Sequence, residues 1–186
     1  MPHLLEPFTL RGVTFRNRIG VSPMCQYSSD DGLANDWHLV HLGARAVGGA
    51  GLVIVEATAV EARGRITPND VGLWSEMHEE PLKRVATFLT EYGAVPGIQL
   101  AHAGRKAGTA RPWDGGGPLS DEGGGWLPIG PSALAFSSGY RVPQEMTVDD
   151  IQGVQSAFQA AAQRALVSGF RYLELHAAHG LSLIHI

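Results

Sequence analysis

Polar side chains that can hydrogen-bond or titrate follow four apolar runs of this sequence, each where the run ends. The four segments are 22–27 (SPMCQY), 56–58 (EAT), 99–102 (QLAH) and 176–179 (HAAH). If the runs are parallel strands, their carboxyl ends meet at one edge of the sheet, which is where such folds place their chemistry. We therefore expect the four segments to form one polar pocket above an apolar interior.

His176 and His179 lie three residues apart, and several kinds of chemistry suit them. Two neutral imidazoles can bind a metal ion, with Glu174 as a carboxylate beside them. They can instead donate paired hydrogen bonds to a carbonyl oxygen and polarise it for attack. A structural alternative is hydrogen bonding at the end of a strand. The metal interpretation lacks a second ligand cluster, because His38 and His41 fall on a predicted helix as a solvated or packing face.

Four other polar residues at these strand ends each have two interpretations. Cys25 is either a small buried side chain or a thiol that touches an electron-rich cofactor and tunes it. Tyr27 is either a rim aromatic or a phenol that donates to a substrate oxygen. Gln99 lies in an apolar run, where a buried amide needs partners from the backbone or from a heterocycle with donor and acceptor edges. His102 is either a site residue or a side chain that braces the long loop that follows it.

A basic segment follows the third apolar run and contains Arg105, Lys106 and Arg111. These side chains suit an anionic cofactor or a nicotinamide donor, although a solvated loop is the more usual role of such residues.

The elements that must position these groups follow from the hydrophobic periodicity. The sequence predicts a hairpin around Arg11-Gly12, strands at 18–24, 51–57, 95–102 and 170–177, and helices at 36–49, 79–93 and 146–169. Thr147 and Asp150 form a cap pair for the last helix. Its predicted apolar stripe consists of Ile151, Val154, Phe158, Ala161, Ala165 and Leu166. The glycine- and proline-rich segment 103–146 shows little periodicity.

Alternating buried strands and amphipathic helices indicate an α/β fold with a parallel sheet. The candidates are a doubly wound sheet and a (β/α)₈ TIM barrel. The first predicted strand is followed by SPMCQYSS and not by a G-x-G-x-x-G fingerprint, which counts against a dinucleotide-binding doubly wound sheet. Because four strands cannot close a parallel barrel, the barrel interpretation predicts about the first four βα units and an N-terminal hairpin.

The composition is that of a globular protein: 186 residues, 44% hydrophobic and 17% charged. The formal net charge of −4 gives no case for a nucleic-acid or membrane-surface partner. Cys25 is the only cysteine, so no internal disulfide can form and a reducing compartment is expected. The first residues do not resemble a secretory signal, and no window approaches the roughly eighteen apolar residues that span a membrane. We expect a cytoplasmic protein.

Several motifs occur together in this order: SPMCQYSS, VEATAV with GRIT, GIQLAHAGRK, PSALAF and ELHAAHG. Jointly they resemble the old yellow enzyme family of FMN-dependent NAD(P)H oxidoreductases, also called NADPH dehydrogenases. The cysteine after the first strand is similar to the cysteine-containing, thermophilic-like branch. The insertion RPWDGGGP…GGGW resembles members of that branch that are similar to xenobiotic reductase A. The resemblance extends to about Gly180.

The resemblance implies a (β/α)₈ barrel with FMN at its carboxyl-terminal mouth. It implies FMN contacts at Ser22, Pro23, Met24, Cys25, Ala57 and Gln99. His176 and His179 would hold the oxygen of an α,β-unsaturated carbonyl, with Tyr27 as a further anchor and Cys25 as the residue that tunes the flavin potential. NADPH or NADH would reduce the flavin, and the activated C=C bond of an enone would be the substrate. The full-length relatives imply a homo-oligomer.

The sequence departs from the family pattern near its end. The family has a proton-donating tyrosine two residues after the second histidine, and Leu181 stands at that position. Residues 1–180 correspond to the N-terminal half of a flavin oxidoreductase barrel, and 181–186 read as a non-family tail that suggests a truncation artefact. A chain of this length is expected to be inactive. The alternatives are a metal-dependent TIM-barrel hydrolase using Glu174, His176 and His179, and a non-catalytic half-barrel fragment.

Overall fold

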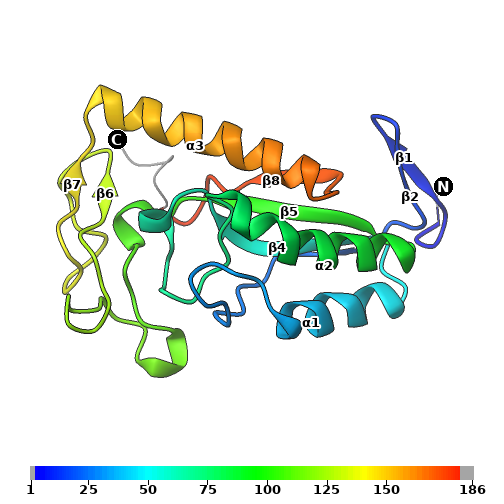
Figure 1. Cartoon of the computed structure of the whole chain (residues 1–186), viewed down its shortest axis with the longest axis horizontal. Coiled ribbons are helices and arrows are strands. Elements are labelled where there is room, and N and C mark those ends of the chain that lie inside the picture. Colours follow the sequence, from blue (N-terminus) through cyan, green and yellow to red (C-terminus); the bar gives the residue numbers. More distant parts are fainter. Residues whose placement is uncertain (1–2, 181–186) are drawn as a thin grey trace.

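The computed structural model describes residues 3–180, and its centre is a four-stranded parallel sheet. The strands follow one another in the order of the sequence: β3 (Gly20–Val21), β4 (Leu52–Ala59), β5 (Val95–Ala101) and β8 (Tyr172–Leu175). Helices α1 (Asp36–Val47), α2 (Glu79–Glu91) and α3 (Val148–Val167) connect them (Figure 1). The predicted alternation of strands and helices is confirmed, although β3 and β8 are shorter than their apolar runs.

Alternate residues of the strands face opposite sides of this sheet. Val53 and Val55 of β4 and Ile98 of β5 are fully buried in the core shared with the three helices. Ile54 of β4 and Gln99 of β5 point to the opposite side and line a cavity. The sheet therefore has a helix-covered face and a cavity face, as a segment of barrel wall has.

The helix ends confirm the predicted cap and correct part of the predicted stripe. Thr147 accepts a hydrogen bond from the Asp150 backbone N–H at 3.1 Å, and the Asp150 carboxylate accepts one from the Thr147 N–H at 3.0 Å. Val154, Ala161 and Ala165 are buried, and Phe158 packs at the edge of the core. Ile151 and Leu166 are 44% and 58% exposed, so their place in the core stripe was predicted wrongly. On a helical wheel both positions lie toward one edge of the apolar arc, on the same side of the buried Ala161 and Ala165.

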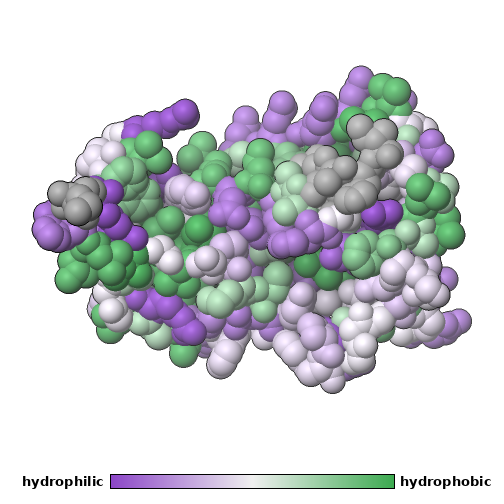
Figure 2. All heavy atoms as spheres, turned by 180° about the vertical axis from the view of Figure 1, so that it is seen from behind, coloured by the Kyte–Doolittle hydropathy of each residue, from purple (hydrophilic) through white to green (hydrophobic). Residues whose placement is uncertain are grey.

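The predicted hairpin forms from β1 (Phe8–Leu10) and β2 (Val13–Phe15), which pair in antiparallel register around Arg11-Gly12. It lies at the end of the molecule opposite the segment 103–146 (Figure 1). Phe8, Phe15, Leu52 and Tyr172 line a shallow apolar recess of about 410 Å³ between the hairpin and the sheet. Figure 2 shows hydrophobic surface gathered at this end of the molecule.

The segment 103–146 contains little regular structure, as expected from its composition. It holds short 3-10 turns at Gly104–Lys106 and Pro112–Asp114 and a two-residue pairing of β6 (Ile129–Gly130) with β7 (Gln144–Glu145). Two further 3-10 turns, Ala62–Gly64 and Glu76–His78, lie between β4 and α2. Within residues 3–180, no helix is long and apolar enough to cross a membrane.

Candidate functional site

One cavity of about 850 Å³ opens at the carboxyl ends of the parallel strands, and all four polar segments contribute to it. Its volume is in the range of a site for a large organic cofactor or ligand. The predicted site residues that line it are Ser22, Pro23, Cys25, Tyr27, Ala57, Gln99, His176 and His179. The sequence spreads these residues over more than 150 positions, and the fold brings them to one mouth.

Met24 is the predicted site residue that the structure places elsewhere. It is 45% exposed and is not among the residues that line the cavity. Its backbone carbonyl accepts a hydrogen bond from Gln26 Nε2 at 2.7 Å. Its neighbours Pro23 and Cys25 face the cavity, so the side chain of Met24 between them turns outward.

Cys25 and Tyr27 face the cavity as neutral hydrogen-bonding groups. Burial, together with the charges of Asp70 and Glu56, raises the pKa of the Cys25 thiol to about 12. Burial also raises the pKa of the Tyr27 phenol, and the neighbouring thiol adds to that shift. At neutral pH the thiol is therefore not a thiolate nucleophile, and the phenol keeps its proton for donation. Tyr27 has a φ of +49°, and its ring meets Trp113 edge-on with centroids 5.9 Å apart.

A β-bulge in β4 decides which side chains of this strand reach the cavity. Pairing with β5 shifts register between Val55 and Ala57, so Glu56 is the extra residue. Ala57 consequently faces the cavity, and Glu56 is 3% exposed beneath the segment 25–27. Its Oε2 lies 3.7 Å from Nε2 of His38, which is 1% exposed.

Glu56 and His38 form a buried pair in which both groups are neutral near pH 7. Burial raises the pKa of Glu56 to about 8 and lowers the pKa of His38 to about 4. His38 Nδ1 accepts a hydrogen bond from the Asn35 backbone N–H at 3.0 Å, which leaves the ring proton on Nε2 facing Glu56. His38 is thus part of the N-terminal cap of α1 and belongs to the packing face that the sequence allowed for it.

Gln99 and Glu174 are tied to each other on the cavity wall. Gln99 Nε2 donates a hydrogen bond of 2.5 Å to Glu174 Oε1, across the pairing of β5 with β8. Because Glu174 holds the amide nitrogen, the Oε1 of Gln99 is the end of the amide that faces away from it. The partner of the buried Gln99 amide is therefore Glu174, for which the sequence analysis considered only the role of a metal ligand.

His176 and His179 lie side by side at the mouth. Their ring centroids are 5.1 Å apart, and His179 Nδ1 lies 3.4 Å from His176 Nε2. Burial, the neighbouring His179 and Lys106 together lower the pKa of His176, against the charge of Glu174. His176 is therefore neutral near pH 7 and can act as a hydrogen-bond donor. His179 has a φ of +60°, and its backbone carbonyl accepts from Lys106 Nζ at 2.8 Å.

The long segment supplies cavity residues that the sequence did not single out as site residues. The further lining residues from this segment are Thr109, Ala110, Pro112, Gly116 and Tyr140, and the β4–α2 connection adds Ile66 and Thr67. Lys106 also lines it, and its ammonium lies 4.4 Å from the centre of the Phe136 ring. Of the three basic residues by the third strand, Lys106 is the one that reaches the cavity. The others, Arg105 and Arg111, are not among the lining residues.

His102 braces the long segment, as one of its two interpretations predicted. It is 1% exposed; its Nε2 lies 2.7 Å from Glu61 Oε1, and its Nδ1 accepts from the Gly104 N–H. The metal-hydrolase alternative finds no ligand set: in the described part of the chain, no three His, Cys, Asp or Glu side chains are grouped to hold a metal ion. Glu174 Oε1 instead accepts a hydrogen bond from Gln99.

A comparison with protein families decides between the remaining interpretations. The model of the NADH:flavin oxidoreductase / NADH oxidase family matches residues 3–185. The chain belongs to this family. Members of this family are oxidoreductases that use FMN and a nicotinamide hydride donor, which confirms the cofactors that the motifs implied.

Curated members of the NADH:flavin oxidoreductase family are close in sequence. An NADH:flavin oxidoreductase of Gibberella zeae is 50% identical over 184 residues, which are 97% of this chain and 45% of that protein. An NADPH dehydrogenase of a Geobacillus species is 49% identical over 95% of this chain and 48% of its own length. The chain therefore spans about half the length of the curated relatives it matches.

Solved structures confirm the old yellow enzyme resemblance and the barrel fold. Morphinone reductase superposes with a TM-score of 0.81 at 27% identity, over 97% of this chain and 49% of that one. An old yellow enzyme homologue from Zymomonas mobilis superposes with a TM-score of 0.80 at 26% identity, over 97% and 50% of the two chains. The four strands and three helices are thus a segment of a TIM barrel, as predicted. The finer assignment to the cysteine-containing branch stays a prediction.

The residues present at the mouth fit a flavin. An isoalloxazine ring is a flat heterocycle with an apolar face and an edge of alternating donors and acceptors. The cavity lining includes the apolar side chains of Ile54 and Ala57 and the amide of Gln99, which Glu174 orients. The neutral thiol of Cys25 adds a polarizable group without a charge.

Proposed function

We propose that this chain supplies the flavin-face and substrate residues of an FMN-dependent oxidoreductase that reduces activated C=C bonds of α,β-unsaturated carbonyls with NADPH or NADH. The observation that carries the proposal is the convergence of four groups on one mouth: two imidazoles, a neutral thiol and a neutral phenol. FMN, when bound, supplies hydride transfer between the nicotinamide donor and the substrate carbon.

The proposed cofactor contacts come from three strand ends. Ser22, Pro23, Met24 and Cys25 would lie along the flavin after β3, with Met24 acting through its backbone because its side chain points outward. Ala57 would contact it from β4 through the bulge, and Gln99 from β5 through its oriented amide. The unsaturated carbonyl is assigned to the space between His176, His179 and Tyr27.

The two imidazoles act on the substrate oxygen in this proposal. Negative charge grows on that oxygen as the C=C bond is reduced, and N–H groups already aimed at it stabilise the developing enolate. His176 is held in place by its backbone N–H, which donates to the Leu100 carbonyl at 2.9 Å. Lys106 holds the backbone of His179. Both rings therefore start from fixed backbone positions.

The direct test is a titration followed by turnover. We expect a complete barrel that contains these residues to bind FMN and to oxidise NADPH or NADH faster when a cyclic enone is added than without it, whereas residues 1–186 alone are expected to be inactive. A saturated ketone of the same shape should give no acceleration, because it has no C=C bond to reduce. Equal rates with the enone and the saturated ketone would exclude the proposed substrate class.

We further propose a cytoplasmic homo-oligomer whose partners are small molecules. The single cysteine and the absence of any possible internal disulfide support a reducing compartment. The net charge of −4 gives no support for a nucleic-acid partner. Sedimentation of the FMN-loaded protein would establish the number of chains.

Replacing Glu174 by leucine should weaken FMN binding, because the Gln99 amide would lose the acceptor that orients it. Loss of one charge-assisted hydrogen bond predicts an FMN dissociation constant about tenfold higher. Fluorescence quenching of FMN on titration measures this constant. Glu174→Gln is the matched control: it keeps an acceptor oxygen at the same place and should stay within about threefold of the unmodified chain. Equal losses in both variants would show that the carboxylate acts through its charge.

A further inference from the structure

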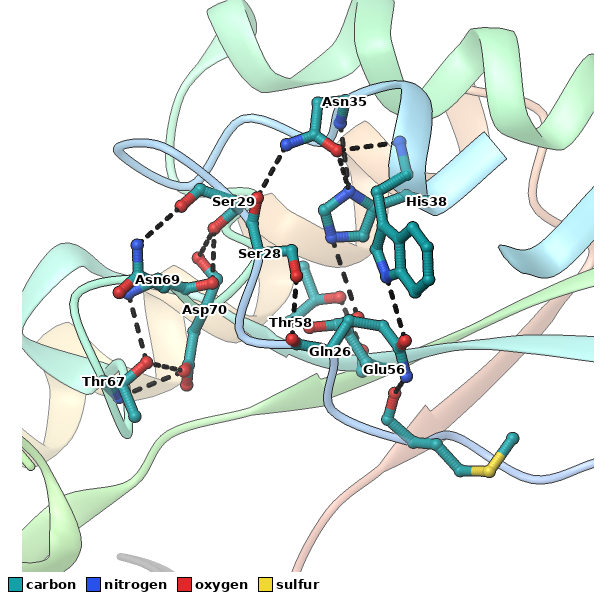
Figure 3. A network of polar contacts seen from close by, with 12 residues as sticks. Gln26, Ser28, Ser29, Asn35, His38, Glu56, Thr58, Thr67, Asn69 and Asp70 are labelled. Carbon is teal, nitrogen blue, oxygen red and sulfur yellow. Dashed lines mark hydrogen bonds and ion pairs between the residues drawn. The ribbon is translucent and has the colours of Figure 1, made fainter. Parts of the chain in front are cut away.

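The turn from Met24 to Ser28 directs the side chains of Cys25 and Tyr27 into the cavity and the side chain of Gln26, which lies between them in the sequence, away from it. Cys25 and Tyr27 line the cavity, whereas Gln26 does not. Gln26 uses both ends of its amide on the other side of the turn: Nε2 donates to the Met24 carbonyl at 2.7 Å, and Oε1 accepts from Trp37 Nε1 at 3.0 Å. Figure 3 shows the Gln26 side chain within this network.

Helix α1 is therefore linked to the turn at its first residues. Trp37 lies in the first turn of α1, and its indole stacks on His41 with centroids 6.4 Å apart. Its backbone N–H donates to Asn35 Oδ1 at 3.0 Å, and Asn35 Nδ2 donates to the Ser28 carbonyl at 2.6 Å. The start of the helix thus reaches the turn at two points, through Gln26 and through Ser28.

The turn needs such support because its conformation is unfavourable by itself. Tyr27 has a φ of +49°, in the left-handed region that a non-glycine residue seldom adopts. Such a conformation persists where the surrounding structure over-determines it. From below, the Glu56 carboxyl meets the backbone N–H groups of Gln26 and Tyr27. The Gln26 amide and Glu56 therefore hold the turn from two sides.

We propose that Gln26 is a positioning residue that fixes the Cys25 thiol and the Tyr27 phenol in the cavity by linking their turn to Trp37 of α1. It touches neither flavin nor substrate in this scheme. The inference deepens the proposed function and rests on it for the roles of the thiol and the phenol. The link itself is independent of any bound cofactor.

Cys25 reports on the link directly, because it is the only cysteine of the chain. Its alkylation by iodoacetamide requires exposure and ionisation of the thiol, both of which the intact turn opposes. In the FMN-free chain, Trp37→Phe keeps the stacked ring and removes one neutral hydrogen bond, which predicts about fivefold faster alkylation. Gln26→Met keeps the length of the side chain and removes both hydrogen bonds, which predicts at least about tenfold faster alkylation.

A double-mutant cycle separates the link from general loosening. If Gln26 acts through Trp37, the double variant should alkylate no faster than Gln26→Met alone, since the indole bond is already lost. Trp126→Phe is the matched control: it also removes one indole hydrogen bond, to the Arg63 carbonyl at 2.9 Å, in a different part of the molecule. It should stay within about twofold of the unmodified chain. Multiplicative effects of Gln26→Met and Trp37→Phe, or an equal acceleration in Trp126→Phe, would overturn the proposal.

Two further measurements complete the test. The far-UV spectrum and melting temperature establish that each variant is folded, and Trp37→Phe, at a half-exposed position, carries the test if Gln26→Met does not fold. In the FMN-loaded protein, Gln26→Met should shift the flavin reduction potential, whereas Trp126→Phe should not. Accelerated alkylation in a chain that binds no flavin would support the link and contradict the proposed function. A shift in neither reporter would exclude Gln26 as a positioning residue.

Discussion

Replacing His176 and His179 together by alanine is expected to lower the rate constant for oxidation of the reduced, FMN-loaded protein by an enone about 10²- to 10³-fold. The two rings lie 5.1 Å apart at the mouth of the cavity, and His176 is neutral near pH 7 because burial lowers its pKa. Removing both takes away the donors aimed at the oxygen on which charge develops. Single-turnover oxidation of the reduced protein by an enone, followed at the flavin absorption band, measures the loss.

Molecular oxygen provides the control for this prediction, because it oxidises the reduced protein without presenting a carbonyl. The rate of oxidation by oxygen should change little in the double variant. His3→Ala removes an exposed imidazole outside the site and should change neither the rate with oxygen nor the rate with the enone. Each single variant should show a smaller decrease in the rate with the enone than the double variant. The two single decreases need not multiply to the double one, since the two rings contact each other. An equal loss with oxygen and with the enone would indicate a displaced flavin and contradict the assigned role.

Glu56→Gln should stabilise the chain, and the gain in free energy of unfolding over the unmodified chain should grow with pH. Glu56 has a pKa of about 8 in the folded state, raised from 4.5 by burial. Above pH 4.5 the unfolded chain releases this proton while the folded chain keeps it, so the folded state is penalised progressively up to about pH 8. This margin, the free energy of unfolding of the variant minus that of the unmodified chain, should therefore increase by about 1.5 kcal/mol between pH 6.5 and 8.

Urea unfolding at pH 6.5 and 8 measures this margin, and other titrating groups cancel because they are present in both chains. Asp150→Asn is the control, since hydrogen bonds from Thr147 lower the pKa of Asp150 and keep it ionised in both states between pH 6.5 and 8. Its contribution changes only at lower pH, so its margin should be flat over the measured range. A flat margin for Glu56→Gln would show that Glu56 is ionised throughout and that His38 serves as its partner ion.

The sequence was informative where burial and strand direction decide the structure. Unbroken apolar runs predicted β4 and β5, and the rule that parallel strands end at one edge correctly predicted that Cys25, Gln99 and His176 share one cavity. The cap pair of α3 was readable because side chains three residues apart satisfy each other locally.

Other features depend on contacts that no local pattern encodes. The bulge at Glu56 leaves no mark on the composition of β4, and the exposure of Met24 follows from the path of the turn rather than from residue type. Periodicity marked Ile151 and Leu166 as core because it gives the direction of an apolar arc, not how much of that arc the neighbouring elements cover. Lys106 could be recognised as basic, but its reach into the cavity depends on the fold of the segment 103–146.

The bulge in β4 also determines how this strand responds to a deletion. Val55 faces the helices opposite Ile98, and Ala57 faces the cavity opposite Gln99, so the two residues flanking Glu56 already alternate correctly with β5. Removing Glu56 would leave a regular ladder with every other side chain on its present side. The pairing of β4 with β5 thus does not require this residue. Loss of one codon here would leave the sheet intact and would remove the carboxyl that contacts the backbone of Gln26 and Tyr27.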